Sequence, residues 1–433
     1  MDKHRFNQGM LSFIEGAPTP FHATRSMLDT LLAAGFIRLN EADGWQLDKP
    51  GKYVVTRNDS SLIAFIIGEK DLLADGFRML GAHTDSPCLK VKPQPDKVVQ
   101  GYYQLGVEVY GGALLNPWFD RDLSLAGRVS YLSKAGRIEN VIINFEQPIA
   151  VIPSLAIHLD KAANKERTIN AQLHLPPLVA QLENEGESPR FNELLLAHLV
   201  EREQCSDVTK VLDYELYFYD TQPPGLVGLD QQFIASARLD NLLSCYVGLQ
   251  SLLTAGGEQS SMLICSDHEE VGSASCCGAQ GPFLRSVLER VCGDNETLTR
   301  VVDRSVLISA DNAHGIHPNY PDKHDENHGP LLNRGPVIKI NANQRYATNS
   351  ATSALIRHLG EQAGVPLQSF VTRSDMGCGS TIGPITAAEM GVKTVDIGVP
   401  TFAMHSIREL AGSEDAWMLK QLVDGFFKSD NLL

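Results

Sequence analysis

The stretch Phe77-Arg78-Met79-Leu80-Gly81-Ala82-His83-Thr84-Asp85 joins a short apolar run to side chains that can bind a metal. Residues 77–82 have the length and the apolar character of a buried strand. His83 and Asp85 follow where this strand ends, and their two-residue spacing places them on the same side of an extended chain. In open α/β sheets, ligands bind beyond the carboxyl ends of the strands. The junction therefore predicts both a sheet and a site at its edge.

The same pattern recurs four more times, so that the first and last examples lie more than 300 residues apart in sequence. In each case a short strand or the start of a helix runs into a side chain that can bind a metal. Because strand ends meet at one edge of such a sheet, we expect these side chains to converge. The other four junctions are Arg238-Leu239-Asp240-Asn241, Ser261–Ser266 before Asp267-His268-Glu269-Glu270, Ser305–Ala310 before Asp311-Asn312-Ala313-His314, and Thr394–Pro400 before Met404-His405-Ser406.

Strands and helices alternate in the first and last parts of the chain, whereas the middle is rich in strands with Gly-rich turns. The alternation predicts an α/β domain with a mixed central sheet that is flanked by helices. The middle predicts a β-rich domain inserted into it. The expected limits are 1–93 and 234–433 for the two parts of the α/β domain, and 94–233 for the insertion.

Composition excludes several classes of protein. The 433 residues contain 37 Lys and Arg against 52 Asp and Glu, and the net charge of −15 argues against binding to nucleic acid or to anionic lipid. No apolar run approaches the roughly 18–20 residues that span a membrane. The eight cysteines form no CxxC pair, which favours a reducing compartment over a disulfide framework. The first residues lack the apolar core of a signal peptide, so we expect a cytoplasmic protein.

The side chains at the five junctions suit a pair of metal ions. Two histidines and three carboxylates are nitrogen and oxygen ligands of the kind that zinc, cobalt or manganese accept. Two ions roughly 3.5–4 Å apart need one carboxylate to bridge them. Glu269 and Glu270 repel each other unless a cation lies between them, and one can bind metal while the other takes a proton from water. Asp85 can accept the ring N–H of His83.

Each of these residues has a simpler explanation when it is taken alone. Asp240 can cap the helix that follows it, and Glu269-Glu270 can be a solvated charged turn. Among the four histidines at positions 314, 317, 324 and 328, His314 is the best functional candidate, and Cys276-Cys277 is interpreted as structural. The glycine-rich stretch at 376–380 lacks the phosphate-loop pattern and favours a close approach of backbone to a substrate. The prediction of a metal site therefore depends on the joint pattern.

Five motifs, in the same order along the chain, resemble the aspartyl aminopeptidase family. The resemblance extends over nearly the whole chain and implies a hydrolase, a zinc metalloprotease with two metal ions and a zinc-exopeptidase-like catalytic domain. It also implies that the inserted domain mediates dimerisation and that the dimers assemble into dodecamers. The motifs are Gly81-Ala82-His83-Thr84-Asp85-Ser86-Pro87, Arg238-Leu239-Asp240-Asn241, Asp267-His268-Glu269-Glu270-Val271-Gly272-Ser273, Ser309-Ala310-Asp311-Asn312-Ala313-His314 and Ala403-Met404-His405-Ser406.

The resemblance also implies a role for each motif residue. Asp240 would bridge two divalent ions, most simply Zn²⁺, with Co²⁺ or Mn²⁺ as alternatives. His83 and Asp311 would complete one ion, and Glu270 and His405 the other. Glu269 would be the general base, with Asp85 behind His83. The segment Ile152–His158 matches one in which the family presents a histidine to the substrate of a neighbouring subunit, which makes His158 a candidate.

The predicted activity is the removal of N-terminal amino acids, acidic by resemblance, from peptides with a free N-terminus. An acidic side chain needs a cation, and the candidates are Lys339, Arg345, Arg373 and His158. A preference for neutral N-terminal residues is an alternative, as is cleavage of an amide in a small metabolite by an amidase or deacylase. A third alternative is a non-catalytic scaffold with a vestigial site. This hypothesis predicts that at least one metal ligand or the general base is missing, whereas all of them are present in the sequence.

Overall fold

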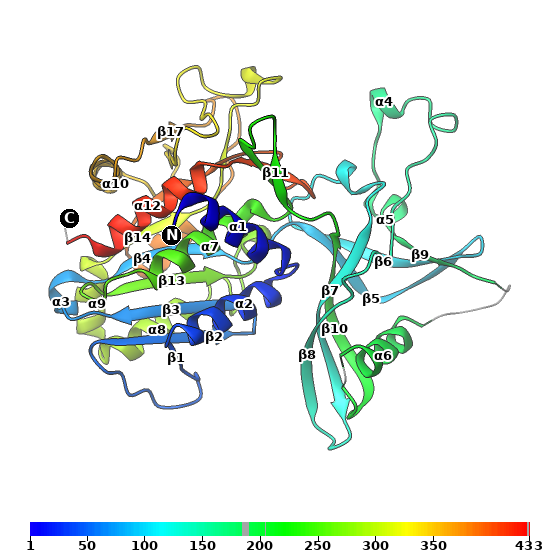
Figure 1. The fold of residues 1–433 in the computed structure, drawn as a ribbon, viewed down its shortest axis with the longest axis horizontal. Helices are drawn as coiled ribbons and strands as arrows, with labels where there is room; N and C mark the ends of the chain where they lie inside the picture. Colours follow the sequence, from blue (N-terminus) through cyan, green and yellow to red (C-terminus); the bar gives the residue numbers. More distant parts are fainter. Residues whose placement is uncertain (184–189, 204, 431–432) are drawn as a thin grey trace. The chain divides into compact units, whose positions relative to one another are not determined.

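A computed structural model describes residues 1–183, 190–203, 205–430 and 433 of the chain (Figure 1). Within these ranges, no helix is both long enough and apolar enough to cross a membrane.

The chain forms two compact units. The first consists of Met1–Ser86, Pro224–Met404 and Glu409–Leu433, and the second of Pro87–Pro223 with His405–Arg408. The limits expected from sequence, 1–93, 94–233 and 234–433, stay a prediction for where independently folding domains begin and end.

A nine-stranded sheet forms the centre of the first unit, in the order β1-β2-β3-β13-β4-β14-β18-β16-β17. Four central strands, β13, β4, β14 and β18, run parallel to one another, whereas β3 pairs antiparallel with β2 and β13, and β16 pairs antiparallel with β18 and parallel with β17. The predicted α/β class with a mixed sheet is confirmed. The strands are β1 (Ile37–Arg38), β2 (Gly51–Arg57), β3 (Ser61–Ile67), β4 (Arg78–His83), β13 (Ser261–Ser266), β14 (Val306–Ala310), β16 (Val337–Lys339), β17 (Gln368–Phe370) and β18 (Lys393–Gly398).

Helices cover both faces of this sheet because its strands are apolar on both sides. In β3, Leu62, Ala64 and Ile66 pack into one core, and Ile63 and Phe65 into another on the opposite face. The first core is completed by helices α1 (Lys3–Glu15), α2 (Pro20–Ala33), α7 (Leu239–Leu253), α10 (Ser350–Ala363) and α12 (Asp415–Lys428). The second is completed by α8 (Phe283–Cys292) and α9 (Asn295–Arg304).

A smaller sheet in the first unit joins the loops that follow the central strands. Its order is β11-β12-β20-β19-β15, and β15 pairs with β19 through Ala313 opposite Pro400 and His314 opposite Thr401. The segments that continue from β14 and β18 therefore stay side by side beyond the central sheet. The strands are β11 (Gly225–Val227), β12 (Phe233–Ser236), β15 (Ala313–His314), β19 (Pro400–Phe402) and β20 (Glu409–Gly412).

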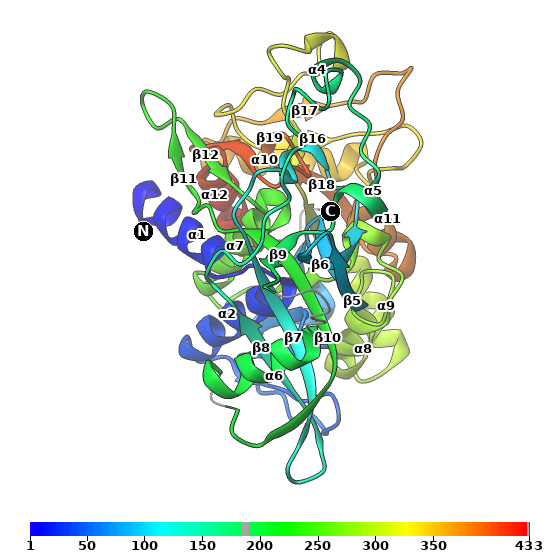
Figure 2. The same cartoon turned by 90° about the vertical axis from the view of Figure 1, so that its right-hand side faces the viewer.

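The second unit is built on a six-stranded antiparallel sheet in the order β8-β7-β10-β5-β6-β9. Helix α6 (Phe191–Glu201) lies against β10, where its buried residues Phe191, Leu195 and Leu199 join the core of the unit (Figure 2). The strands are β5 (Cys88–Val99), β6 (Tyr102–Tyr110), β7 (Leu123–Ser133), β8 (Ile138–Asn144), β9 (Leu178–Gln181) and β10 (Val208–Asp220).

The remaining elements are short. They are α3 (Leu72–Asp75), α4 (Ala163–Glu166), α5 (Ala171–His174), α11 (Ile382–Met390) and the single turns η1 (Asn116–Trp118), η2 (Glu269–Val271) and η3 (Pro321–Lys323).

Candidate metal centre

The ends of three neighbouring strands place the predicted metal ligands of the first unit at one edge of the sheet. In the parallel register, Ser266 of β13 lies opposite His83 of β4, and Ser309 of β14 lies opposite Gly81. The residues that follow β13 and β14 therefore leave the sheet beside His83. The sequence-based expectation that strand ends bring these motifs together agrees with this register.

His83 faces two carboxylates with one ring nitrogen and a backbone carbonyl with the other. Its Nε2 lies 3.3 Å from Oδ1 of Asp240 and 3.7 Å from Oδ1 of Asp311, while Nδ1 lies 3.1 Å from the carbonyl oxygen of Asp85. Because a carbonyl oxygen only accepts, Nδ1 carries a proton, which leaves Nε2 as the ring nitrogen that can bind a metal. A proton on Nε2 or a metal ion in its place offsets the charge of the two carboxylates, and the nitrogen and oxygen donors fit a divalent metal.

Glu270 adds a further carboxylate to this group. One ligand atom each of His83, Asp240 and Glu270 lies within 4.8 Å of the others. Burial raises the pKa of Glu270 well above its ordinary value, and Asp240 raises it further. Burial by itself lowers the pKa of His83, but hydrogen bonds to Asp240, Asp311 and Asp85 raise it well above the ordinary value. A bound divalent cation would offset part of this concentration of negative charge.

Asp85 connects the histidine to the loop that carries both glutamates. Its Oδ1 accepts the backbone N–H of Glu269 at 3.1 Å, its Oδ2 accepts that of Glu270 at 3.1 Å, and Oδ1 lies 3.3 Å from Nδ1 of His83. The Asp85 side chain is fully buried. The sequence predicts the contact with His83 from spacing, whereas the two N–H groups come from residues more than 180 positions away.

The partly buried Glu269 carboxylate lies on the same loop. Burial raises the pKa of Glu269 to about 7, with the carboxylates of Asp311 and Asp240 adding to the effect and His83 opposing it. A carboxyl group with such a pKa exchanges a proton easily near neutral pH.

Two further charged residues, Lys339 and Glu409, contact predicted metal ligands. Nζ of Lys339 lies 3.5 Å from Oδ2 of Asp311 and donates to the carbonyl of Asn312 at 3.1 Å. Lys339 is 2% exposed, which favours a role in holding Asp311 over contact with a substrate side chain. Oε2 of Glu409 accepts the N–H of Asp240 at 2.9 Å. Glu409 is not predicted from the sequence, because a carboxylate 169 positions away from Asp240 leaves no local signal.

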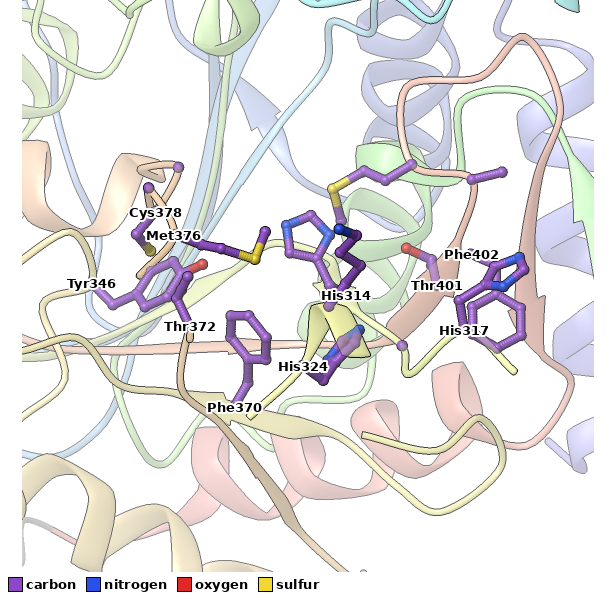
Figure 3. A pocket seen from close by; sticks show the side chains of 16 residues that line it. His314, His317, His324, Tyr346, Phe370, Thr372, Met376, Cys378, Thr401 and Phe402 are labelled. Atoms are coloured by element: carbon purple, nitrogen blue, oxygen red, sulfur yellow. The ribbon is translucent and has the colours of Figure 1, made fainter. Parts of the chain in front are cut away.

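A cavity of about 300 Å³ lies in the first unit, next to the strand that follows Asp311. His314 lies in the middle of the view, with Tyr346, Met376 and Cys378 on one side and Thr401, Phe402 and His317 on the other (Figure 3). The lining residues are His314, Gly315, His317, Lys323, His324, Tyr346, Phe370, Thr372, Met376, Gly377, Cys378, Gly379, Thr401, Phe402, Ala403 and Met404. Residues 376–379 of the glycine-rich stretch, which the sequence predicts to approach a substrate, are among these lining residues.

Two of the cationic residues that were candidates for contact with an acidic substrate, Arg373 and Arg345, do not line this cavity. Arg373 pairs with Asp375 at 2.7 Å and donates to the carbonyl of Asp322. Arg345 lines a different, open depression together with Ser380 and Glu389.

The two remaining predicted residues belong to the second unit. His158 lies in an exposed turn. Nδ1 of His405 lies 3.2 Å from the carbonyl oxygen of Gly112, which assigns the proton to Nδ1 and the lone pair to Nε2. This tautomer is the one that binds a metal through Nε2.

Comparison with known proteins identifies what the chain resembles. The family described as "Aminopeptidase I zinc metalloprotease (M18)" matches residues 13–427. A "Probable M18 family aminopeptidase 2" of Stutzerimonas stutzeri (strain A1501) is 60% identical over 430 residues, which are 99% of this chain and 100% of that relative.

Solved structures show the same fold. In the "Cryo-EM structure of the Ape4 and Nbr1 complex", a chain with 39% identity matches with a TM-score of 0.93, over 98% of this chain and 86% of that one. The "Structure of S. cerevesiae mApe1 dodecamer" matches with 29% identity and a TM-score of 0.83, over 97% of this chain and 96% of that one.

Proposed function

The chain belongs to the M18 family of zinc aminopeptidases, the aspartyl aminopeptidase family, and we propose that it removes acidic residues from the N-termini of peptides. The observation that carries the metal-dependent chemistry of the proposal is the convergence of His83, Asp240 and Asp311, with distances of 3.3 and 3.7 Å from Nε2 of His83. Family membership establishes a zinc-dependent hydrolase that acts on peptides from the N-terminus. The substrate preference and the role of each residue are the proposal.

We propose two divalent ions with five protein ligands. His83 and Asp311 would hold one ion, Glu270 and His405 would hold the other, and Asp240 would be shared between them. The distances around His83 and the grouping of His83, Asp240 and Glu270 support the ligands of the first unit. His405 is proposed from its motif and from the tautomer that its contact with Gly112 supports. Zinc suits this ligand set, and cobalt or manganese is an alternative.

Glu269 acts as the general base in this proposal. When bound, the two ions polarise the scissile carbonyl and lower the pKa of the attacking water. A carboxylate oxygen of Glu269 takes the proton from that water and then returns it to the leaving amine. The pKa of about 7 that burial confers on Glu269 suits both transfers near neutral pH. Asp85 holds the loop in place through the N–H groups of Glu269 and Glu270.

The cavity around His314 is the proposed binding site for the side chain of the N-terminal residue that is cleaved off. Lys323 is a cation among its lining residues, and the three histidines 314, 317 and 324 supply hydrogen-bond donors for a carboxylate. His158 from a neighbouring subunit, together with Arg345 or Arg373, remains a further proposed contact. Phe370, Tyr346 and Met376 support the second candidate, a preference for neutral side chains, because they make part of the wall apolar.

We further propose that the second unit mediates dimerisation and that dimers form a dodecamer in the cytoplasm. The similarity to a dodecameric structure supports the assembly. The cysteine pattern, without any CxxC pair, supports a reducing compartment.

A panel of aminoacyl chromogenic substrates tests the proposal. The metal-stripped enzyme, reconstituted separately with zinc, cobalt or manganese, is expected to cleave aspartyl and glutamyl substrates with a higher kcat/KM than leucyl ones. N-acetylated versions of the same substrates are expected to resist cleavage, because an aminopeptidase needs a free amine. A preference for leucyl substrates would establish the neutral candidate instead, and cleavage of the acetylated compounds would favour an amidase or deacylase.

A further inference from the structure

A second group of metal-binding side chains flanks the catalytic glutamates and uses none of the five proposed ligands. It consists of Asp267, His268 and Cys277, and one ligand atom from each lies within 4.8 Å of the others. Asp267 and Cys277 are 4% and 2% exposed, whereas the His268 ring is partly open to solvent. A small cation therefore has a route to the buried donors past this ring.

The imidazole of His268 lies between the other two donors. Its Nδ1 lies 3.4 Å from Sγ of Cys277 and 2.9 Å from Oγ of Ser275, and its Nε2 lies 3.6 Å from Oδ2 of Asp267. Oγ of Ser275 also lies 3.6 Å from Sγ of Cys277. An imidazole binds one ion through one nitrogen, so the donors of a single ion are one ring nitrogen of His268, Sγ of Cys277 and a carboxylate oxygen of Asp267, and such a set lies within 4.8 Å.

The backbone around this group holds the donors in place. The N–H of Asp267 donates to the carbonyl of Cys277 at 3.2 Å and to Oγ of Ser61 at 3.1 Å. The hydroxyl of Ser61, at the start of β3, in turn donates to the carbonyl of Cys277 at 2.8 Å. Two donors separated by ten positions in sequence are thus joined through a strand of the central sheet. Preorganisation of this kind reduces the entropic penalty of binding an ion.

We propose that Asp267, His268 and Cys277 form a third metal site, which binds a thiophilic divalent ion such as zinc, with water or Ser275 in the fourth position. On binding, the thiol of Cys277 releases its proton to solvent and the thiolate becomes the ligand. A thiolate favours zinc, cobalt or cadmium over magnesium and manganese. The five ligands of the proposed catalytic pair are nitrogen and oxygen donors, so sulfur is what distinguishes the third site.

An ion bound at this site would restrain the loop that carries Glu269 and Glu270. Asp267 and Cys277 bracket the segment that carries Glu269 and Glu270, and an ion held by both closes that segment into a ring. The occupied site restrains the loop, so we expect slower backbone hydrogen exchange at residues 268–276 with zinc bound than with magnesium. Only the catalytic meaning of this restraint depends on the proposed function; the site itself does not.

Cobalt titration of the full-length, metal-stripped protein tests the proposal. Cobalt bound to a thiolate absorbs in the near ultraviolet through charge transfer, whereas cobalt bound only to nitrogen and oxygen does not. We expect this band in the wild-type protein and in Cys276→Ser, the adjacent exposed cysteine, and its loss in Cys277→Ser. Absence of the band from the folded wild-type protein, or its persistence in Cys277→Ser, would overturn the proposal.

A second variant covers the case in which Cys277→Ser fails to fold. His268→Gln removes a half-exposed ligand and keeps the thiol, so we expect cobalt to bind at the band-forming site about tenfold or more weakly. Unchanged affinity in this variant contradicts the site. Because the readout is a thiolate absorption and not turnover, an enzyme that fails the aminopeptidase assay can still pass this test, and the reverse also holds.

Discussion

Nζ of Lys339 lies 3.5 Å from Oδ2 of Asp311, and both side chains are buried. Asp311 meets Nε2 of His83 with its other carboxylate oxygen. The lysine therefore compensates part of the negative charge of a proposed metal ligand from the side away from the histidine. Removal of such a partner leaves a buried charge and strongly destabilises the folded protein, unless another cation takes the place of the lysine.

Lys339→Met is expected to destabilise the metal-free protein more than the metal-loaded one. Without the ammonium, the charge of Asp311 is left buried, at a penalty of about 3–5 kcal/mol, and a bound ion offsets part of it. Thermal unfolding with and without a chelator measures the difference. If Lys339 contacts an acidic substrate instead, the variant raises KM for aspartyl substrates alone.

Lys420→Met is the matched control for this prediction. Lys420 is also buried and pairs with a carboxylate, that of Asp424 at 2.6 Å, on α12. Its loss is expected to lower the melting temperature equally with and without metal. An equal shift in both conditions for Lys339→Met would contradict the role that we assign to it.

Glu269→Gln is expected to lower kcat by roughly 10²–10⁴, because the amide cannot accept the proton of the attacking water. The fold and the number of bound ions are expected to remain, which circular dichroism and elemental analysis measure. Glu270→Gln is the contrasting variant, expected to lose one ion. Glu289→Gln, on the exposed side of α8, is expected to change neither property. An active Glu269→Gln enzyme would refute the assignment of the base.

Asp85→Asn is expected to lower activity or metal affinity by about 10–100-fold. An amide retains one acceptor oxygen in place of two, so one of the N–H groups of Glu269 and Glu270 loses its partner. Asp71→Asn is the control, because Asp71 is an exposed cap of α3 whose Oδ1 accepts the N–H of Leu73. Equal effects of the two variants would mean that Asp85 has no special part in holding the loop.

His22→Gln is expected to remove part of the acid sensitivity of folding. Burial, with help from Arg238 and Arg25, lowers the pKa of His22 from 6.5 to about 4. The unfolded chain therefore takes up this proton at a higher pH than the folded chain does. The stabilisation is fully present above pH 6.5 and is lost as the pH falls towards 4, by on the order of 2–3 kcal/mol.

Urea unfolding at several pH values between 4 and 7 checks this prediction. The free energy of unfolding of the wild-type protein, relative to that of His22→Gln, is expected to decrease as the pH is lowered. His358→Gln, an exposed position on α10, is the control and is expected to leave the pH profile unchanged. Parallel profiles for the wild-type protein and His22→Gln would contradict the assigned cause.

Local sequence was sufficient to predict many elements of the fold. Helix α7 spans Leu239–Leu253, and the apolar spacing of its residues is a local signal. Helices α8 and α9 are not assigned by the sequence analysis, although Phe283, Leu284, Val287 and Leu288 follow helical spacing. The apolar spacing of α8 is therefore a local signal from which this helix can be predicted.

Two of the groups around the candidate site required the tertiary structure. Lys339 has an ordinary position in the sequence, and only packing against Asp311 distinguishes it from the partly exposed Arg373. Cys277 follows an exposed cysteine and is interpreted as structural from sequence, whereas the structure places its sulfur beside His268.

The sequence by itself determined which side chains can bind metal, in what order they occur, and to which family the chain belongs. These properties depend on residue type and on short spacings along one strand or loop, which the chain carries at every stage of folding. The tertiary structure decided the partners: Asp85 under two glutamate N–H groups, Lys339 behind Asp311, and Cys277 next to Asp267. Distances of 3–5 Å between segments far apart in sequence depend on strand register and packing, which no local pattern specifies.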